Sequence, residues 1–140
     1  MEFEDIRSFL ETNHRAIVQT IRPNGAVHAS AVVCGAFEGY MALASVYPRS
    51  QKVRNLRRNP QCTVLCITPD WRTYVVVEGK AELKGAFNTD AEELRLLLRD
   101  IFRACSGNEH PDWEEYDEAM VKQDSVAILV TPETVYGKLT

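Results

Sequence analysis

The residues best able to do chemistry lie in one short basic segment. Residues 51–58 carry apolar side chains only at Val53 and Leu56, and we expect a short helix there with Ser50 as its N-cap. The first amides of a helix have no partner within it, and Gln51 and Lys52 fall in that first turn. Unpaired amides beside a lysine favour a phosphate or another anion. The segment therefore predicts an anion site at Ser50, Gln51 and Lys52, and the alternative is an ordinary solvated helix.

The charge of the chain is unevenly distributed around this segment. The net charge is −4, yet residues 39–69 contain no Asp or Glu and carry five basic residues, namely Arg49, Lys52, Arg54, Arg57 and Arg58. A local cationic segment in an acidic protein favours a discrete anionic ligand over a polyanion. We therefore expect no nucleic-acid partner, and we extend the candidate site along the helix to Arg54.

A catalytic group within the chain is not apparent. The sequence has no G-x-S-x-G and no H-E-x-x-H motif, and its adjacent carboxylates occur as Glu92-Glu93 and Glu114-Glu115. Neighbouring side chains on a helix diverge by about 100°, so these pairs cannot converge on one substrate atom. We assign no catalytic residue, and we expect a cofactor to supply the reactive atom if the protein is an enzyme.

The cysteines and histidines do not form a metal site or a disulfide framework. Cys62 and Cys66 would lie on one face of a strand about 13 Å apart, too far for a disulfide. No C-x-x-C occurs and the three histidines are far apart, so we expect buried free thiols and no zinc. We interpret His28 as a hydrogen-bonded sheet histidine and Tyr136 as a core or dimer-contact aromatic.

Length and composition place the chain in a broad class. With 140 residues, 45% of them hydrophobic and 26% charged, it has the profile of one ordinary domain spanning residues 1–140. It has no apolar run of about 18 residues and no basic-then-apolar N-terminal segment, so we expect a cytoplasmic protein without a membrane span. The dinucleotide and P-loop glycine motifs are absent, which argues against those nucleotide-binding folds.

Hydrophobic periodicity predicts the elements that must position the basic segment. Turn signals at residues 23–25 and 38–39 divide the first part of the chain into an antiparallel meander. Cys62–Thr68 is almost entirely apolar, so we expect a strand buried on both faces. The next strand alternates, with its odd-numbered residues from Val75 to Leu83 facing the core. The expected strands are 16–22, 27–37, 40–46, 62–68, 73–84 and 126–130, the last continuing extended to Gly137.

Helices are expected at the N-terminus and late in the chain. Phe3–Thr12 has apolar residues at helical spacing, which predicts an amphipathic helix. The Thr89-x-x-Glu92 spacing predicts a capping box at the start of a second amphipathic helix. Pro111 stands where a first helical turn tolerates proline, before a stripe of Trp113, Tyr116 and Met120. Together the elements predict a mainly β, α+β fold, a small antiparallel barrel of about six strands with peripheral helices.

One stretch resembles a known family signature. Residues 48–60, PRSQKVRNLRRNP, resemble the signature of the FMN-binding split β-barrel superfamily, which includes pyridoxamine 5′-phosphate oxidase. Further segments in the same order resemble its actinobacterial branch that depends on the deazaflavin coenzyme F420. They are TIRPNGAVHAS (20–30), YVVVEGKAEL (74–83), HPDWEEYDEAM (110–120) and VYG (135–137), so the resemblance extends over essentially the whole chain.

The resemblance implies a homodimeric split β-barrel with the cofactor in a groove at the dimer interface. It assigns Lys52 to the cofactor phosphate, Ser50 and Gln51 to the flanking positions and Ser45 to a strand end beside the cofactor. Trp71 resembles an aromatic that relatives place near the cofactor. Many members have Arg where this chain has Gln51, which removes one charge from the phosphate contacts.

The resemblance also implies a function. We expect a coenzyme F420-dependent reductase acting on a small unsaturated organic molecule. The alternatives are an FMN-dependent oxidoreductase of the same fold, or a non-catalytic protein that binds F420 or haem. The basic, acid-free segment favours F420 over FMN, because the oligoglutamate tail of F420 adds carboxylates that FMN lacks.

Overall fold

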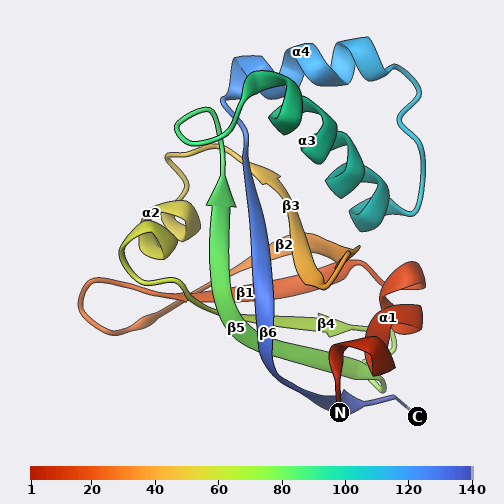
Figure 1. Ribbon diagram of the computed structural model, residues 1–140. Helices are drawn as coiled ribbons and strands as arrows, with labels where there is room; N and C mark the ends of the chain where they lie inside the picture. The colour runs from red at the N-terminus through yellow and green to blue at the C-terminus, as the bar shows by residue number, and fades with distance from the viewer. Residues whose placement is uncertain (140) are drawn as a thin grey trace.

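The chain forms a closed antiparallel barrel flanked by helices (Figure 1). The computed structural model describes residues 1–139, apart from the side chains of residues 45 and 46. The strand order around the barrel is β1-β2-β3-β6-β5-β4, which confirms the expected fold class. The strands are β1 (Arg15–Ile21), β2 (Val27–Phe37), β3 (Tyr40–Val46), β4 (Gln61–Ile67), β5 (Tyr74–Lys84) and β6 (Val126–Lys138), and the helices are α1 (Phe3–Thr12), α2 (Gln51–Arg58), α3 (Ala91–Ser106) and α4 (Trp113–Gln123).

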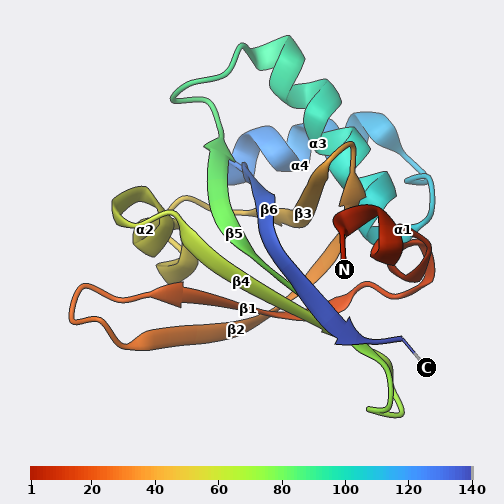
Figure 2. The same cartoon turned by 60° about the horizontal axis from the view of Figure 1, so that its bottom comes forward.

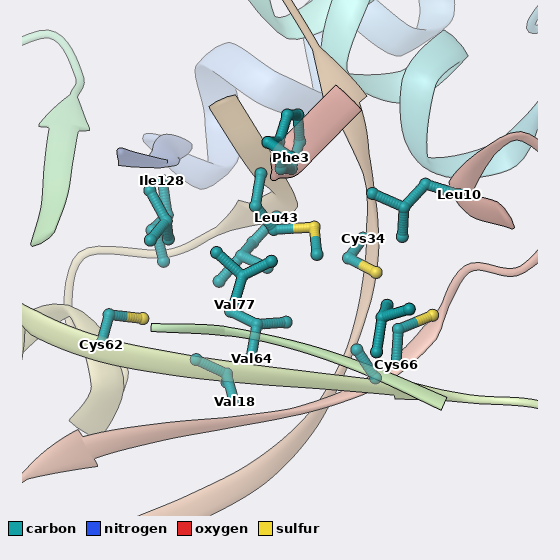
Figure 3. Close-up of a cluster of buried hydrophobic side chains, with 14 of the residues drawn as sticks. Phe3, Leu10, Val18, Cys34, Leu43, Cys62, Val64, Cys66, Val77 and Ile128 are labelled. Carbon is teal, nitrogen blue, oxygen red and sulfur yellow. The ribbon is translucent and has the colours of Figure 1, made fainter. Parts of the chain in front are cut away.

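The barrel interior is an apolar core, shown in Figure 3. Val18, Val64, Val77 and Ile128 come from four different strands and are all almost completely buried. The expected inward direction of the odd-numbered residues of β5 is confirmed, because Val75 and Val77 are inaccessible to solvent. Helix α1 adds Leu10 to this cluster. This core holds the strands that carry the candidate site.

Helix α3 covers one part of the outer barrel wall, and α4 packs on α3 (Figures 1 and 2). The apolar stripe of α3, including Leu98 and Ile101, packs on outward-facing residues of β3 and β6 such as Ala42. The approach is close at Gly35, where a Cβ atom would lie 2.0 Å from the carbonyl oxygen of Ala104. Glycine is therefore required there for α3 to rest on β2.

The cysteines occupy the interior, as their apolar surroundings indicate. All four are free thiols and all are buried. Burial raises the pKa of Cys62 and of Cys105 to about 12, so neither thiol ionises near neutral pH. The interaction with the Cys66 sulfur, together with burial, raises the pKa of Cys34, while the Cys66 thiol itself donates to the Asn13 carbonyl oxygen at 3.3 Å.

Three local expectations are wrong. Within a single chain, strand β4 is not buried on both faces: every second residue is buried, and the others, including Leu65 and Ile67, stay partly exposed. The N-cap of α3 is Asp90 and not Thr89, because the Asp90 carboxylate accepts from the amides of Glu92 and Glu93. Helix α4 is capped by Asp112, which places Pro111 before the helix instead of in its first turn.

The barrel is split between β2 and β3. Strand β2 pairs with β1 along Val27–Val33, whereas its pairing with β3 is confined to Cys34–Phe37. The other edge of residues 27–33 is therefore unpaired within the described part of the chain. The split leaves the first half of β2 available to a ligand or another element.

The outer face of the remaining strands carries one apolar row, most of which is exposed to solvent. The register aligns Ala31, Ile17, Leu65, Val76 and Tyr136 in one row across β2, β1, β4, β5 and β6. Ile17 is 37% and Tyr136 46% exposed. We call this row and its apolar flanks, which include Val27 and Val33, the bare face. Tyr136 thus lies outside the core.

None of the helices in the described residues is both long and apolar enough to span a membrane.

Candidate functional site

The basic segment forms a helix that begins where the sequence predicts. The Ser50 hydroxyl oxygen accepts a hydrogen bond from the Val53 amide at 3.4 Å, so Ser50 is the N-cap of α2. The amides of Gln51 and Lys52 precede the first intrahelical bond, which the Arg54 amide donates to the Ser50 carbonyl at 3.1 Å. Two N–H groups are thereby left to bind an anion.

Lys52 lies in this first turn without a counter-ion. Its side chain is partly buried, and no hydrogen bond or ion pair joins it to another described residue. Burial lowers the pKa of the Lys52 ammonium. A desolvated and unpaired cation lowers the free energy of unfolding. Such groups concentrate at sites that bind an anion.

A buried polar network fixes α2 on the barrel. Asn55 is inaccessible to solvent and donates to the hydroxyl of Thr20 on β1 at 3.0 Å. Gln51 in turn donates to the Asn55 side-chain oxygen at 2.8 Å. The sequence patterns did not predict this network. The one signal for it in the sequence is an asparagine, Asn55, next to Leu56 on the apolar stripe of the helix. Gln51 is therefore engaged within the helix, and its role towards a cofactor remains a prediction.

The arginines of α2 are not equivalent. Arg57 stacks on the ring of Phe87 with its guanidinium carbon 4.5 Å from the ring centroid, and Arg58 donates to the Ile21 carbonyl. Arg54 is exposed and has no partner among the described residues. It lies two residues after Lys52, about 200° around the helix, so the two side chains cannot bind the same phosphate group.

The first half of β2 brings two further polar groups to this region. The interpretation of His28 as a hydrogen-bonded sheet histidine is wrong, because its buried Nδ1 atom has no hydrogen-bond partner, and neither has the buried Oγ of Ser30. His28 lies opposite Thr20 in the β1–β2 register, and Thr20 is the residue that anchors α2. Buried polar atoms without partners are rare and indicate a missing ligand or water. A lone His and a lone Ser carry no sequence signal that could have found them.

The remaining predicted residues lie elsewhere or outside the described side chains. The backbone of Ser45 belongs to β3, and its side chain lies outside the described part of the structure. Trp71 is 79% exposed in the hairpin between β4 and β5. Strand β4 runs from α2 to that hairpin and is about 20 Å long. The end of α2 that joins β4 and the hairpin therefore lie at opposite ends of this strand (Figure 2). One chain does not bring these two residues together.

The arrangement suits binding better than acid–base chemistry. No group of three or more His, Cys, Asp or Glu residues is placed to hold a metal ion anywhere in the described residues. The groups gathered around α2 are amides, hydroxyls, an imidazole and an ammonium, all of which are groups that can form hydrogen bonds to a phosphate-bearing polar molecule.

Solved structures share this fold at low sequence identity. A conserved hypothetical protein from Mycobacterium tuberculosis superposes with a TM-score of 0.78 at 22% identity, over 99% of this chain and 84% of that one. An F420 reductase gives 0.64 at 24% identity, over 93% of this chain and 94% of that one. A haem-binding protein from Mycobacterium smegmatis gives 0.70 at 18% identity, over 96% of this chain and 52% of that one.

The match to a family of sequences is more specific than these likenesses of fold. The family model described as pyridoxamine 5′-phosphate oxidase matches residues 3–139, and so includes the barrel, α2 and the split edge of β2. The chain therefore belongs to the pyridoxamine 5′-phosphate oxidase family of split β-barrels.

Proposed function

We propose that the protein is a homodimeric, F420-dependent reductase that acts on a small unsaturated organic molecule. The observation that carries the proposal is Lys52, a partly buried ammonium without a described partner in the first turn of a capped helix. A phosphate placed there would gain the lysine charge and the two free amides of α2 together.

The polar groups beside α2 fit the rest of such a cofactor. F420 and FMN both carry a hydroxylated ribityl chain that ends in phosphate, and the orphaned atoms of His28 and Ser30 need polar partners. Lys52 and the α2 amides would hold the phosphate, and His28 and Ser30 the chain. The reduced deazaflavin supplies the hydride when bound, and the protein binds it, orients it and excludes water.

The exposed arginines favour F420 over FMN. Arg57 and Arg58 contact Phe87 and the Ile21 carbonyl, which leaves Arg54 and Arg49 as exposed cations of the segment without a described partner. Because Arg54 points away from Lys52, it suits a second anionic group, and the oligoglutamate tail of F420 provides carboxylates there. The shared fold of the solved F420 reductase supports the same choice.

A second copy of the chain completes the proposed site. The bare face is apolar across five strands, which favours burial against an equivalent face. Within one chain, β4 separates Trp71 from Lys52, so only another copy can bring Trp71 to the N-terminus of α2. In this arrangement the cofactor lies at the interface, held by α2 of one copy and covered by Trp71 of the other.

The proposal is tested by titrating the purified protein with F420 and with FMN at low and high salt. We expect F420 to bind more tightly, and its affinity to fall more steeply with salt, because exposed charge pairs are screened over about 8–10 Å. Turnover of reduced F420 with a panel of α,β-unsaturated carbonyl compounds then separates a reductase from a binding protein. Tighter FMN binding at every salt concentration would instead identify FMN as the cofactor.

A further inference from the structure

A second site lies on the opposite side of the fold from the bare face. A half-enclosed pocket of about 250 Å³ opens between α3, α4 and the loop that joins β5 to α3. None of the residues that line it belongs to α2, to β2 or to the bare face. Its walls are mainly aliphatic, formed by Leu94, Leu98 and Met120 together with Ala86 and Ala91, and Val121 lies at the rim.

The polar groups around this pocket already have partners within the protein. The Tyr116 hydroxyl donates to the Leu98 carbonyl at 2.8 Å, and the Ser125 hydroxyl donates to the sulfur of Met120 at 3.2 Å. The Thr89 hydroxyl donates to the side-chain oxygen of Asn88 at 2.8 Å. A polar ligand would therefore lose its hydration without gaining equivalent hydrogen bonds.

The charged groups at the pocket are also neutralised. Arg95, its one cation among the described residues, pairs with Glu92 and with Asp117, whose carboxylate also binds Arg99 at 2.5 Å. The remaining lining carboxylate, Asp124, is exposed to water at the rim. An anionic ligand would meet no unpaired cation, and a cationic one would exchange water for an aliphatic wall.

We infer that this pocket binds a neutral, apolar small molecule of one or two rings. An apolar cavity of about 150 Å³ suffices to bind benzene, so a volume of about 250 Å³ accommodates a larger ring compound. The driving force is the removal of apolar surface from water on both sides of the contact. The site is independent of the cofactor site proposed above.

Methionine NMR provides a direct test. The chain has three methionines; Met120 lines the pocket, and Met41 is buried in the barrel core and serves as the internal control. In protein labelled with ¹³C at the methionine methyl groups, titration with toluene should shift the Met120 resonance saturably and leave Met41 unchanged. Benzoate and benzylamine, which carry the same ring with a charge, should produce no saturable shift.

A matched pair of variants locates the binding. Leu94→Trp should fill the pocket and weaken toluene binding at least about tenfold, whereas Leu96→Trp makes the same change on the exposed side of α3, outside the pocket. Thermal melts establish that both variants fold. If Leu94→Trp does not fold, Val121→Lys, at a side chain 81% exposed on the pocket rim, should give the same loss.

The inference would be overturned if toluene caused no saturable shift of the Met120 resonance. It would also be overturned if Leu94→Trp and Leu96→Trp both folded and bound toluene equally well. Binding of a charged analogue as tight as that of toluene would be the third contradicting result. Because the titration contains no F420 or FMN, these results leave the proposed cofactor function unaffected. Failure of the cofactor titration would likewise leave the pocket untouched.

Discussion

Lys52 is held in an environment that is unfavourable for its own charge. Partial burial lowers its pKa, so the folded state favours the neutral amine relative to the unfolded chain. The resulting penalty is fully present below the lowered pKa, therefore at neutral pH, and disappears as the pH rises to the ordinary lysine value of about 10.4.

The first prediction concerns the stability of a Lys52 variant. Lys52→Met keeps the aliphatic stem and removes the desolvated charge, so the free energy of unfolding at pH 7 should stay within about 0.5 kcal/mol of the parent or rise. Urea unfolding measures it. A clear loss of stability would mean that the lysine holds the fold together and is not reserved for a ligand.

Gln51 connects the candidate site to the buried network. Its amide nitrogen donates to Asn55, and Asn55 donates to Thr20. Removal of the Gln51 donor leaves a buried oxygen of Asn55 unpaired, which costs about 1–3 kcal/mol. An arginine in place of Gln51 keeps a donor and adds a positive charge in the first turn of α2.

The second prediction follows from this difference. Gln51→Leu should lower the free energy of unfolding by about 1–3 kcal/mol. Gln51→Arg should leave it nearly unchanged and bind the cofactor as tightly as the parent or more tightly. Urea unfolding and cofactor titration of both variants check the pair. Equal stability of the two variants would contradict the role of the network.

At the scale of elements, an ion-pair cluster joins α3 to α4. The Asp117 carboxylate of α4 accepts from Arg99 and Arg95 of α3, and the hydrogen bond from Arg99 is the main cause of its lowered pKa. A carboxylate with a lowered pKa stabilises the fold above its ordinary pKa of about 3.9, and this contribution is lost as the pH falls through the lowered value.

The third prediction is therefore a pH-dependent difference in melting temperature. Asp117→Asn should melt a few degrees below the parent at pH 7, and the two curves should converge at about pH 2. Glu118→Gln on the same helix is the control, because Glu118 is exposed and has no described partner. A difference that persists unchanged in acid would show that the effect is not electrostatic.

Most elements could be predicted because their periodicity is local. The bounds of α1, α2, β2 and β3 coincide with the residues that the pattern indicates. The cap of α3 could not be assigned, because Thr89 and Asp90 are both good N-caps and only the backbone geometry decides which side chain reaches the free amides. The apolar composition of β4 predicts burial on both faces. Composition alone does not reveal that the outer side chains of this strand lie on the bare face.

At the scale of the whole molecule, the bare face predicts association. Two chains that bury it should form a stable homodimer with well over about 1,200 Å² of buried surface. This surface also determines whether the proposed site is complete, because Trp71 can approach α2 only across it.

The fourth prediction is that one charge in the middle of the row disrupts the dimer. Ile17→Lys should yield a monomer by light scattering at micromolar concentration and should also lose cofactor affinity. Leu96→Lys makes the same change at an exposed apolar residue of α3 and should remain dimeric. A parent protein that is already monomeric would contradict both the interface and the two-chain site.

The parts of the site that the sequence could not predict all depend on long-range contacts. Asn55 meets Thr20 across 35 residues of chain, and the burial of the unpaired Nδ1 atom of His28 depends on residues distant in the sequence. The N-terminus of α2 could be predicted because Ser50, Gln51 and Lys52 are contiguous. Periodicity describes each strand alone and carries no information about where two strands separate.

The central claim is that Lys52 binds the cofactor phosphate, and comparison of F420 with its phosphate-free deazaflavin tests it most directly. In a fluorescence titration, Lys52→Met should bind F420 roughly 10- to 150-fold more weakly than the parent, because one charge-assisted hydrogen bond is lost. Both proteins should bind the phosphate-free compound equally well. Arg54→Met is the matched control on α2 and should cause a smaller, salt-dependent loss for F420. If Lys52→Met weakens both compounds alike, or neither, the phosphate is held elsewhere.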